Sequence, residues 1–175
     1  MRVLLLAGAR PQFIKSAALL PALRAQADVT FVHSGQHADP RMVETHFAGL
    51  GLPEPDVRLD PTRSAARLDS MIDQLSAVLE ERRPDWVVVM GDTESTLAGA
   101  RAAARSGIRL AHVEAGARSG ERDLPEERIR IEVDEGSDLL LCSTPAHAAN
   151  LTGREGVEVV GDVMADVLLA NAQGI

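Results

Sequence analysis

The stretch Trp86-Val87-Val88-Val89-Met90-Gly91-Asp92-Thr93 decides the fold. Its first five residues are apolar, which is typical of a strand buried on both faces of a parallel sheet. The glycine ends the strand, and Thr93 can cap a following helix. The stretch therefore predicts a strand-to-helix unit that carries a carboxylate, Asp92, at the carboxyl end of its strand.

The same unit recurs along the chain and predicts an α/β protein with a Rossmann-like, doubly wound, mostly parallel sheet. Short apolar runs predict strands at 2–7, 27–33, 86–90, 108–113, 138–142 and 157–160, with a weaker candidate at 57–59. Helices are expected from Pro11, over 64–82, after Thr93, from Pro145 and after Gly161.

Composition limits the size and the partners of the protein. A chain of 175 residues, 45% hydrophobic, suits one well-buried domain, which we expect at 1–170, with 171–175 as a truncated linker. A net charge of -8 argues against nucleic acid or an anionic membrane as a partner. The single cysteine, Cys142, excludes an intrachain disulfide and favours a cytoplasmic location.

Three carboxylates, Asp92, Glu114 and Glu126, are expected just past the ends of strands, where a parallel sheet forms its ligand crevice. Acids gathered at that edge indicate an active site. Asp92 has an alternative as a capping or loop carboxylate. The alternative for Glu114 is a purely structural ion network in which nearby arginines pair with the acids. These arginines are Arg118, Arg122, Arg128 and Arg130.

Other polar positions give weaker indications. Arg10, at the start of the first helix, favours an anion such as a phosphate, although the alternative is a tight turn with a solvated arginine. His33 and His37 follow the second strand and are interpreted as substrate contacts rather than metal ligands. His46 and His147 are interpreted as partly exposed, hydrogen-bonded helix residues. Neither a metal nor a cofactor is expected, and no dinucleotide or phosphate-loop glycine motif is present.

Six blocks in order resemble the non-hydrolysing UDP-N-acetylglucosamine 2-epimerases, over about residues 2–170. They are Gly8-Ala9-Arg10-Pro11-Gln12-Phe13-Ile14-Lys15, Gly35-Gln36-His37, Gly91-Asp92-Thr93-Glu94-Ser95-Thr96-Leu97-Ala98-Gly99, His112-Val113-Glu114-Ala115-Gly116-Ala117-Arg118-Ser119, Pro125-Glu126-Glu127 and Val160-Gly161-Asp162-Val163-Met164-Ala165-Asp166. Two departures are Gln12, where the family commonly has glutamate, and Ile129, where its pattern has asparagine.

The resemblance implies one half of a two-domain enzyme of the glycosyltransferase-B type, with the carboxyl-terminal nucleotide-binding domain absent. The implied reaction interconverts UDP-GlcNAc and UDP-ManNAc by abstraction of the C2 proton, elimination of UDP and re-addition. The C2 proton is weakly acidic, so its base has to be desolvated or coupled to other charges. Partners would be a UDP-sugar and the carboxyl-terminal domain, and a homodimer is compatible with the resemblance.

Motif matching assigns roles to single residues. The resemblance implies catalytic roles for Asp92, Glu114 and Glu126. It implies substrate binding by Arg10, Gln36, His37, Arg118 and Arg130. An alternative is a non-catalytic sugar-nucleotide-binding or assembly module that lost activity through changes such as Ile129, and a glycosyltransferase half is a weaker one.

Overall fold

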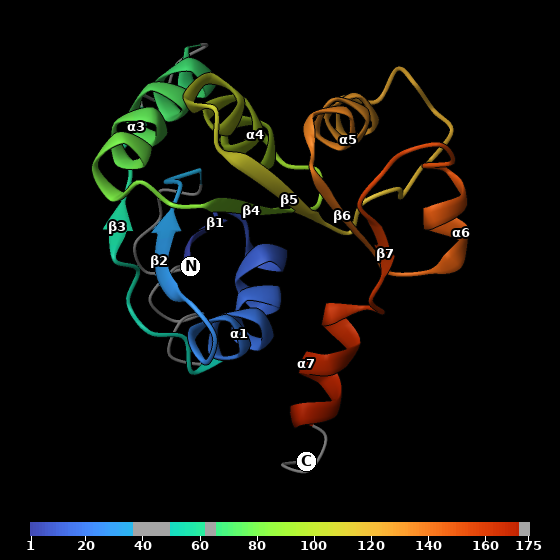
Figure 1. Cartoon of the computed structure of the whole chain (residues 1–175), viewed down its shortest axis with the longest axis horizontal. Coiled ribbons are helices and arrows are strands. Elements are labelled where there is room, and N and C mark those ends of the chain that lie inside the picture. Colours follow the sequence, from blue (N-terminus) through green and yellow to red (C-terminus); the bar gives the residue numbers. More distant parts are fainter. Residues whose placement is uncertain (37–49, 62–65, 172–175) are drawn as a thin grey trace.

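A computed structural model of the chain describes residues 1–36, 50–61 and 66–171 (Figure 1). The described residues form a seven-stranded sheet in the order β3-β2-β1-β4-β5-β6-β7, with all neighbouring strands parallel. The strands are β1 (Arg2–Ala7), β2 (Asp28–His33), β3 (Val57–Arg58), β4 (Trp86–Met90), β5 (Arg109–Val113), β6 (Leu139–Cys142) and β7 (Val157–Val159). The Rossmann-like sheet expected from the sequence is confirmed, and each strand bound lies within one residue of its prediction.

Helices cover both faces of this sheet (Figure 1). One face carries α1 (Arg10–Arg24) and α7 (Val163–Asn171), and the other carries α3 (Arg67–Arg82), α4 (Glu94–Ser106) and α5 (Pro125–Gly136). The short helix α6 (Pro145–Ala149) packs beside β6 and β7. No helix in the described part of the chain is long and apolar enough to cross a bilayer.

Because helices cover both faces of the sheet, apolar residues occupy consecutive positions in strands such as β4 rather than alternate ones. In β4, Val87 and Val89 pack toward α3 and α4, whereas Val88 and Met90 pack toward α1. Each buried aliphatic side chain of this kind stabilises the fold by roughly 1.5–3 kcal/mol. The turn that follows is also as expected, because the Thr93 hydroxyl caps α4 by accepting a hydrogen bond from the Thr96 backbone N–H.

Gln12 joins the turn after β1 to the turn after β4. Its Oε1 accepts hydrogen bonds from the backbone N–H groups of Gly8 (2.8 Å) and Ala9 (3.0 Å). Its Nε2 donates to the Met90 carbonyl oxygen (2.8 Å) and to the Thr93 hydroxyl (3.0 Å). Because the side chain is buried and uses both ends of its amide, glutamine is the residue type that satisfies this position.

The substitution Gln12→Glu is expected to lower the free energy of unfolding by about 1–3 kcal/mol, because a carboxylate cannot donate to the Met90 carbonyl. Urea unfolding at neutral pH measures the loss, which should shrink in acid, where a protonated glutamate regains a donor. Gln74→Glu, on the partly exposed face of α3, is the matched control. An equal loss in both variants would contradict the role assigned to Gln12.

Candidate functional site

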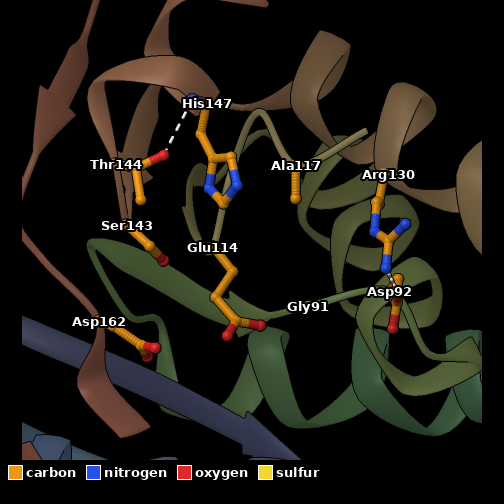
Figure 2. Close-up of a pocket in the computed structure, with 9 residues that line it drawn as sticks. All are labelled: Gly91, Asp92, Glu114, Ala117, Arg130, Ser143, Thr144, His147 and Asp162. Atoms are coloured by element: carbon orange, nitrogen blue, oxygen red, sulfur yellow. Dashed lines mark hydrogen bonds and ion pairs between the residues drawn. The ribbon is translucent and has the colours of Figure 1, made fainter. Parts of the chain in front are cut away.

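A pocket of about 280 Å³ lies at the carboxyl ends of β4 to β7 (Figure 2). Four successive strand ends and the neighbouring helices α5 and α6 supply its walls. The lining residues are Gly91, Asp92, Glu114, Ala117, Arg130, Ser143, Thr144, His147 and Asp162. The expected convergence of acids at this edge of the sheet is therefore observed for Asp92 and Glu114.

Glu114 holds a backbone conformation that is unusual for a residue with a side chain. Its φ is +69°, in the left-handed region, which costs on the order of 1–3 kcal/mol. The turn directs its carboxylate into an ion pair with Lys15 of α1. Among the described residues, no ion pair joins Glu114 to the nearby arginines proposed from the sequence, but Arg130 pairs with Asp92. The proposed network of arginines and acids is therefore confirmed for Asp92 and not for Glu114.

Lys15 is the residue of the site that sequence reasoning missed. It is only 5% exposed, and a buried ammonium requires a charged partner, which Glu114 provides. One signal was available in the sequence, because Lys15 is the single lysine among eighteen basic residues. A lysine retained in such an arginine-rich chain, on the inward face of a helix, marks a specific contact.

Asp92 is held by a second cation. Arg130 of α5 forms an ion pair with Asp92 and lies 3.5 Å from the Glu127 carboxylate. The backbone N–H of Ser119 donates to Glu127 (2.9 Å) and keeps the pKa of that carboxyl below its usual range. The acids at this edge thus form ion pairs with cations rather than one cluster of coupled carboxylates.

Glu126 does not follow a strand, contrary to the placement expected from the sequence. It lies in the first turn of α5, its side chain is exposed, and it is not among the residues that line the pocket. Its neighbour Glu127 is the buried acid of the pair. Successive helix residues point about 100° apart, so the helical spacing of Glu127, Arg130 and Asp134 identifies the inward face of α5.

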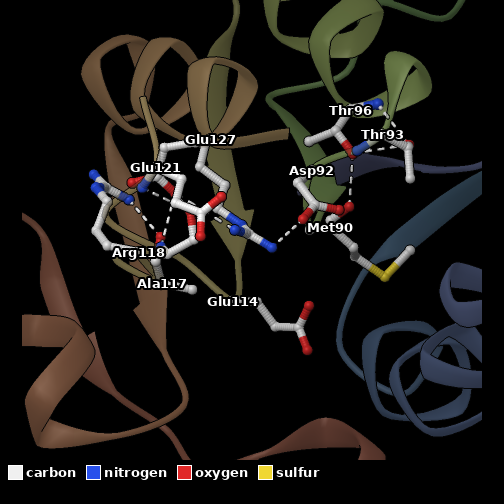
Figure 3. A network of polar contacts seen from close by, with 12 residues as sticks. Met90, Asp92, Thr93, Thr96, Glu114, Ala117, Arg118, Glu121 and Glu127 are labelled. Carbon is white, nitrogen blue, oxygen red and sulfur yellow. Dashed lines mark hydrogen bonds and ion pairs between the residues drawn. The ribbon is translucent and has the colours of Figure 1, made fainter. Parts of the chain in front are cut away.

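A third group of charges lies behind the pocket, around Asp134. His112 of β5 is fully buried, with Nδ1 2.7 Å from Asp134 and Nε2 2.8 Å from the Gly91 carbonyl oxygen. Arg118, expected near the substrate, has Nη1 2.7 Å from Asp134 and donates to the Ala117 carbonyl. Figure 3 shows Arg118 beside Ala117, with the Glu114 carboxylate pointing away from it.

The stability of the protein should fall in acid as Asp134 becomes protonated. Burial opposes ionisation of Asp134, but hydrogen bonds from His112 and then Arg118 outweigh it and lower its pKa below the ordinary 3.8. The unfolded chain therefore takes up this proton first. The stabilisation is complete above pH 3.8 and is lost as pH falls below it. Urea unfolding should show the stability falling across this range, and carbon-13 NMR of the Asp134 carboxyl should give a titration midpoint below 3.8. A midpoint at or above 3.8 would contradict the assignment.

His147 and Asp162 complete the far wall of the pocket. His147 is partly exposed in α6, and its Nδ1 has no hydrogen-bond partner among the described residues, which corrects its interpretation as a hydrogen-bonded helix residue. Asp162 accepts a hydrogen bond from the Met164 N–H (2.8 Å) at the start of α7. Within 1–36, 50–61 and 66–171, no three histidines, cysteines or acids gather as a metal site.

A family model described as UDP-N-acetylglucosamine 2-epimerase matches residues 21–175. The chain belongs to this family. It is 40% identical to the UDP-2,3-diacetamido-2,3-dideoxy-D-glucuronate 2-epimerase of Pseudomonas aeruginosa, over 99% of the chain and 52% of that relative. It is 36% identical to a UDP-N-acetylglucosamine 2-epimerase of Methanocaldococcus jannaschii, over 98% of the chain and 49% of the relative.

Solved structures of the epimerase family agree with the fold. The crystal structure of the Methanocaldococcus jannaschii UDP-GlcNAc 2-epimerase in complex with UDP-GlcNAc and UDP superposes with a TM-score of 0.93 and 35% identity. That match covers 99% of the chain and 50% of the solved protein. The chain spans about half the length of the curated relatives that it matches.

The remaining positions matched to the epimerase family lie after β1, after β2 and in α5, or fall outside the described residues. Arg10 is exposed at the first position of α1. The Gln36 amide oxygen accepts hydrogen bonds from the Ser95 N–H (3.1 Å) and hydroxyl (2.5 Å), which anchors it to α4. His37 and His46 lie outside the described residues. Ile129 is partly buried and packs against the core cluster that includes residues of α3 and α4, so its apolar side chain contributes to packing.

Proposed function

We propose that this chain is the amino-terminal half of a UDP-GlcNAc 2-epimerase that interconverts UDP-GlcNAc and UDP-ManNAc. In this proposal residues 1–170 form one domain, 171–175 belong to the linker, and a carboxyl-terminal domain completes the nucleotide site. Family membership supports the reaction class, and the half-length match to the relatives supports the division into halves.

The observation that carries the proposal is the meeting of Asp92 and Glu114 in one pocket (Figure 2). Inversion at C2 by elimination and re-addition moves a proton on each face of the sugar ring, so at least two positioned acid-base groups are needed. The two acids come from different turns, and Arg130 and Lys15 orient them. We assign proton transfer to both acids. We assign the same role to Glu126, which is exposed in the first turn of α5, the helix that supplies Arg130 to the pocket wall.

The proposed substrate contacts come from two parts of the molecule, the pocket wall and the starts of two helices. Arg130 can reach a ligand from the wall of the pocket, while Arg10 and Gln36 flank the start of α1 and α4, where a phosphate would meet the helix dipole. His37 is assigned to the same side by its motif. Arg118 is assigned to holding the Ala117 turn, because its guanidinium is engaged by Asp134.

The sugar class is a 2-acetamido sugar linked to UDP. The Pseudomonas aeruginosa relative is a 2-epimerase of UDP-2,3-diacetamido-2,3-dideoxy-D-glucuronate, and the Methanocaldococcus jannaschii relative is a 2-epimerase of UDP-N-acetylglucosamine. Both names share the acetamido group at C2 and the epimerised centre. The site described here acts at that centre, so UDP-GlcNAc and the diacetamido uronate should be assayed side by side.

The test is a fusion of this chain to the carboxyl-terminal half of the Methanocaldococcus jannaschii relative, called the fused enzyme below. In D₂O the fused enzyme should incorporate deuterium at C2 of the UDP-sugar, whereas the chain alone should incorporate little. Binding of the sugar nucleotide without exchange would favour the non-catalytic module. Turnover by the chain alone at about 10 per second, a median enzyme rate, would overturn the half-site division.

A further inference from the structure

The hydrogen bonds of His112 determine its charge. Nε2 faces the carbonyl oxygen of Gly91 at 2.8 Å, and a carbonyl oxygen only accepts, so Nε2 must carry a proton. Nδ1 faces Oδ1 of Asp134 at 2.7 Å, and an ionised carboxylate also only accepts. A neutral imidazole has a single N–H, so both contacts are satisfied only by an imidazolium.

Asp134 is in the ionised form that this argument requires. It is 2% exposed, and its Oδ2 accepts hydrogen bonds from the Gly116 N–H (3.1 Å) and from Arg118. Donors therefore occupy both of its oxygens, and they lower its pKa against the effect of burial. Burial raises the pKa of the Cys142 thiol, which faces Asp134 from β6 and is neutral near pH 7.

The contact between His112 and Asp134 connects the two turns that carry the pocket acids. His112 reaches the Gly91 carbonyl, next to Asp92, and Asp134 reaches the Gly116 N–H, two residues after Glu114. Both turns contain left-handed residues, with φ of +68° at Gly91, +69° at Glu114 and +76° at Gly116. A Cβ at Gly116 would lie 2.2 Å from the backbone oxygen of His147, so this turn has little room to relax.

We propose that His112 and Asp134 form a buried imidazolium–carboxylate pair that positions the turns bearing Asp92 and Glu114. His112 and Asp134 are positioning residues, because neither lines the pocket. The protonation state of His112 is inferred from its hydrogen bonds alone. The consequence for catalysis rests on the proposed function, since it requires that Asp92 and Glu114 transfer protons.

The protonation state is tested by nitrogen-15 NMR of the complete 175-residue chain at neutral pH. Both ring nitrogens of His112 should give the chemical shifts and attached-proton couplings of N–H groups. One unprotonated ring nitrogen would overturn the proposal. This measurement needs no substrate. It therefore tests the protonation state of His112 even if the fused enzyme shows no C2 exchange and the proposed function fails.

The positioning role is tested with Asp134→Asn. An asparagine amide can donate to Nδ1 and its oxygen can still accept from Gly116, so His112 becomes neutral while the contacts persist. In the fused enzyme kcat should fall about tenfold or more, with KM within about twofold, as expected for transition-state positioning. Glu132→Gln, on an exposed position of α5, is the matched control and should change neither value.

Unchanged kcat in Asp134→Asn would overturn the positioning role. If that variant fails to fold, hydrogen exchange in the unsubstituted chain decides, because the Gly116 amide donates to Asp134. Its exchange should be as slow as that of the amides in β4 and β5. Fast exchange at Gly116 alone would show that Asp134 does not fix this turn.

Discussion

Glu114→Gln in the fused enzyme is expected to lower deuterium incorporation at C2 about 10³-fold, within the usual range for loss of an acid-base group. Glutamine has nearly the shape of glutamate but cannot take up or release the proton. Its side-chain oxygen can still accept a hydrogen bond from Lys15, so the turn should keep its conformation. The rate of exchange, measured in D₂O by proton NMR of the sugar, gives the effect directly.

The control for this prediction is Glu132→Gln, which makes the same chemical change at an exposed ion pair with Arg101. Exposed pairs of this kind contribute about 0–1 kcal/mol, so this variant should exchange like the unsubstituted fused enzyme. A loss below tenfold in Glu114→Gln would remove Glu114 from the proton-transfer step. The left-handed conformation of Glu114 would then need another explanation.

The sheet and its acid-bearing edge could be predicted from the sequence because each depends on local pattern. A strand covered on both faces is continuously apolar, as at 86–90, and its carboxyl end is fixed by the direction of the chain. Asp92 and Glu114 follow strands directly, so topology alone brought them together. Membership of the epimerase family was also confirmed, because six short blocks in a fixed order are specific.

The partner of Glu114 could not be predicted, because it comes from a distant segment, whereas Arg130 was among the arginines proposed as partners of the acids and pairs with Asp92. Lys15 and Glu114 are 99 residues apart, and Asp92 and Arg130 are 38 apart. Glu126 was misplaced for a different reason. Pro125 begins a helix, and the rotation of that helix, set by packing of Val133 and Ile129 into the core, decides which of two adjacent glutamates is buried.

Lys15→Met is expected to lower C2 exchange in the fused enzyme about 10²-fold, as charge compensation and orientation of Glu114 are both lost. Methionine keeps much of the apolar stem, so the core around α1 stays filled. The Glu114 carboxylate, only 28% exposed, then has no cation in contact, and the free energy of unfolding should fall by about 1–3 kcal/mol. Arg101→Met, which breaks an exposed pair, should cost less than about 1 kcal/mol and leave exchange unchanged.

The double variant Lys15→Met with Glu114→Gln separates a role through Glu114 from an independent role of Lys15. If the lysine acts only by compensating and orienting this carboxylate, its removal has no further effect once the carboxylate is gone. The double variant should then exchange as slowly as Glu114→Gln alone, and it should be more stable than Lys15→Met, since no unpaired charge remains. Multiplication of the two losses would instead show that Lys15 contacts the substrate itself, which would make the buried ammonium a catalytic residue rather than a support for Glu114.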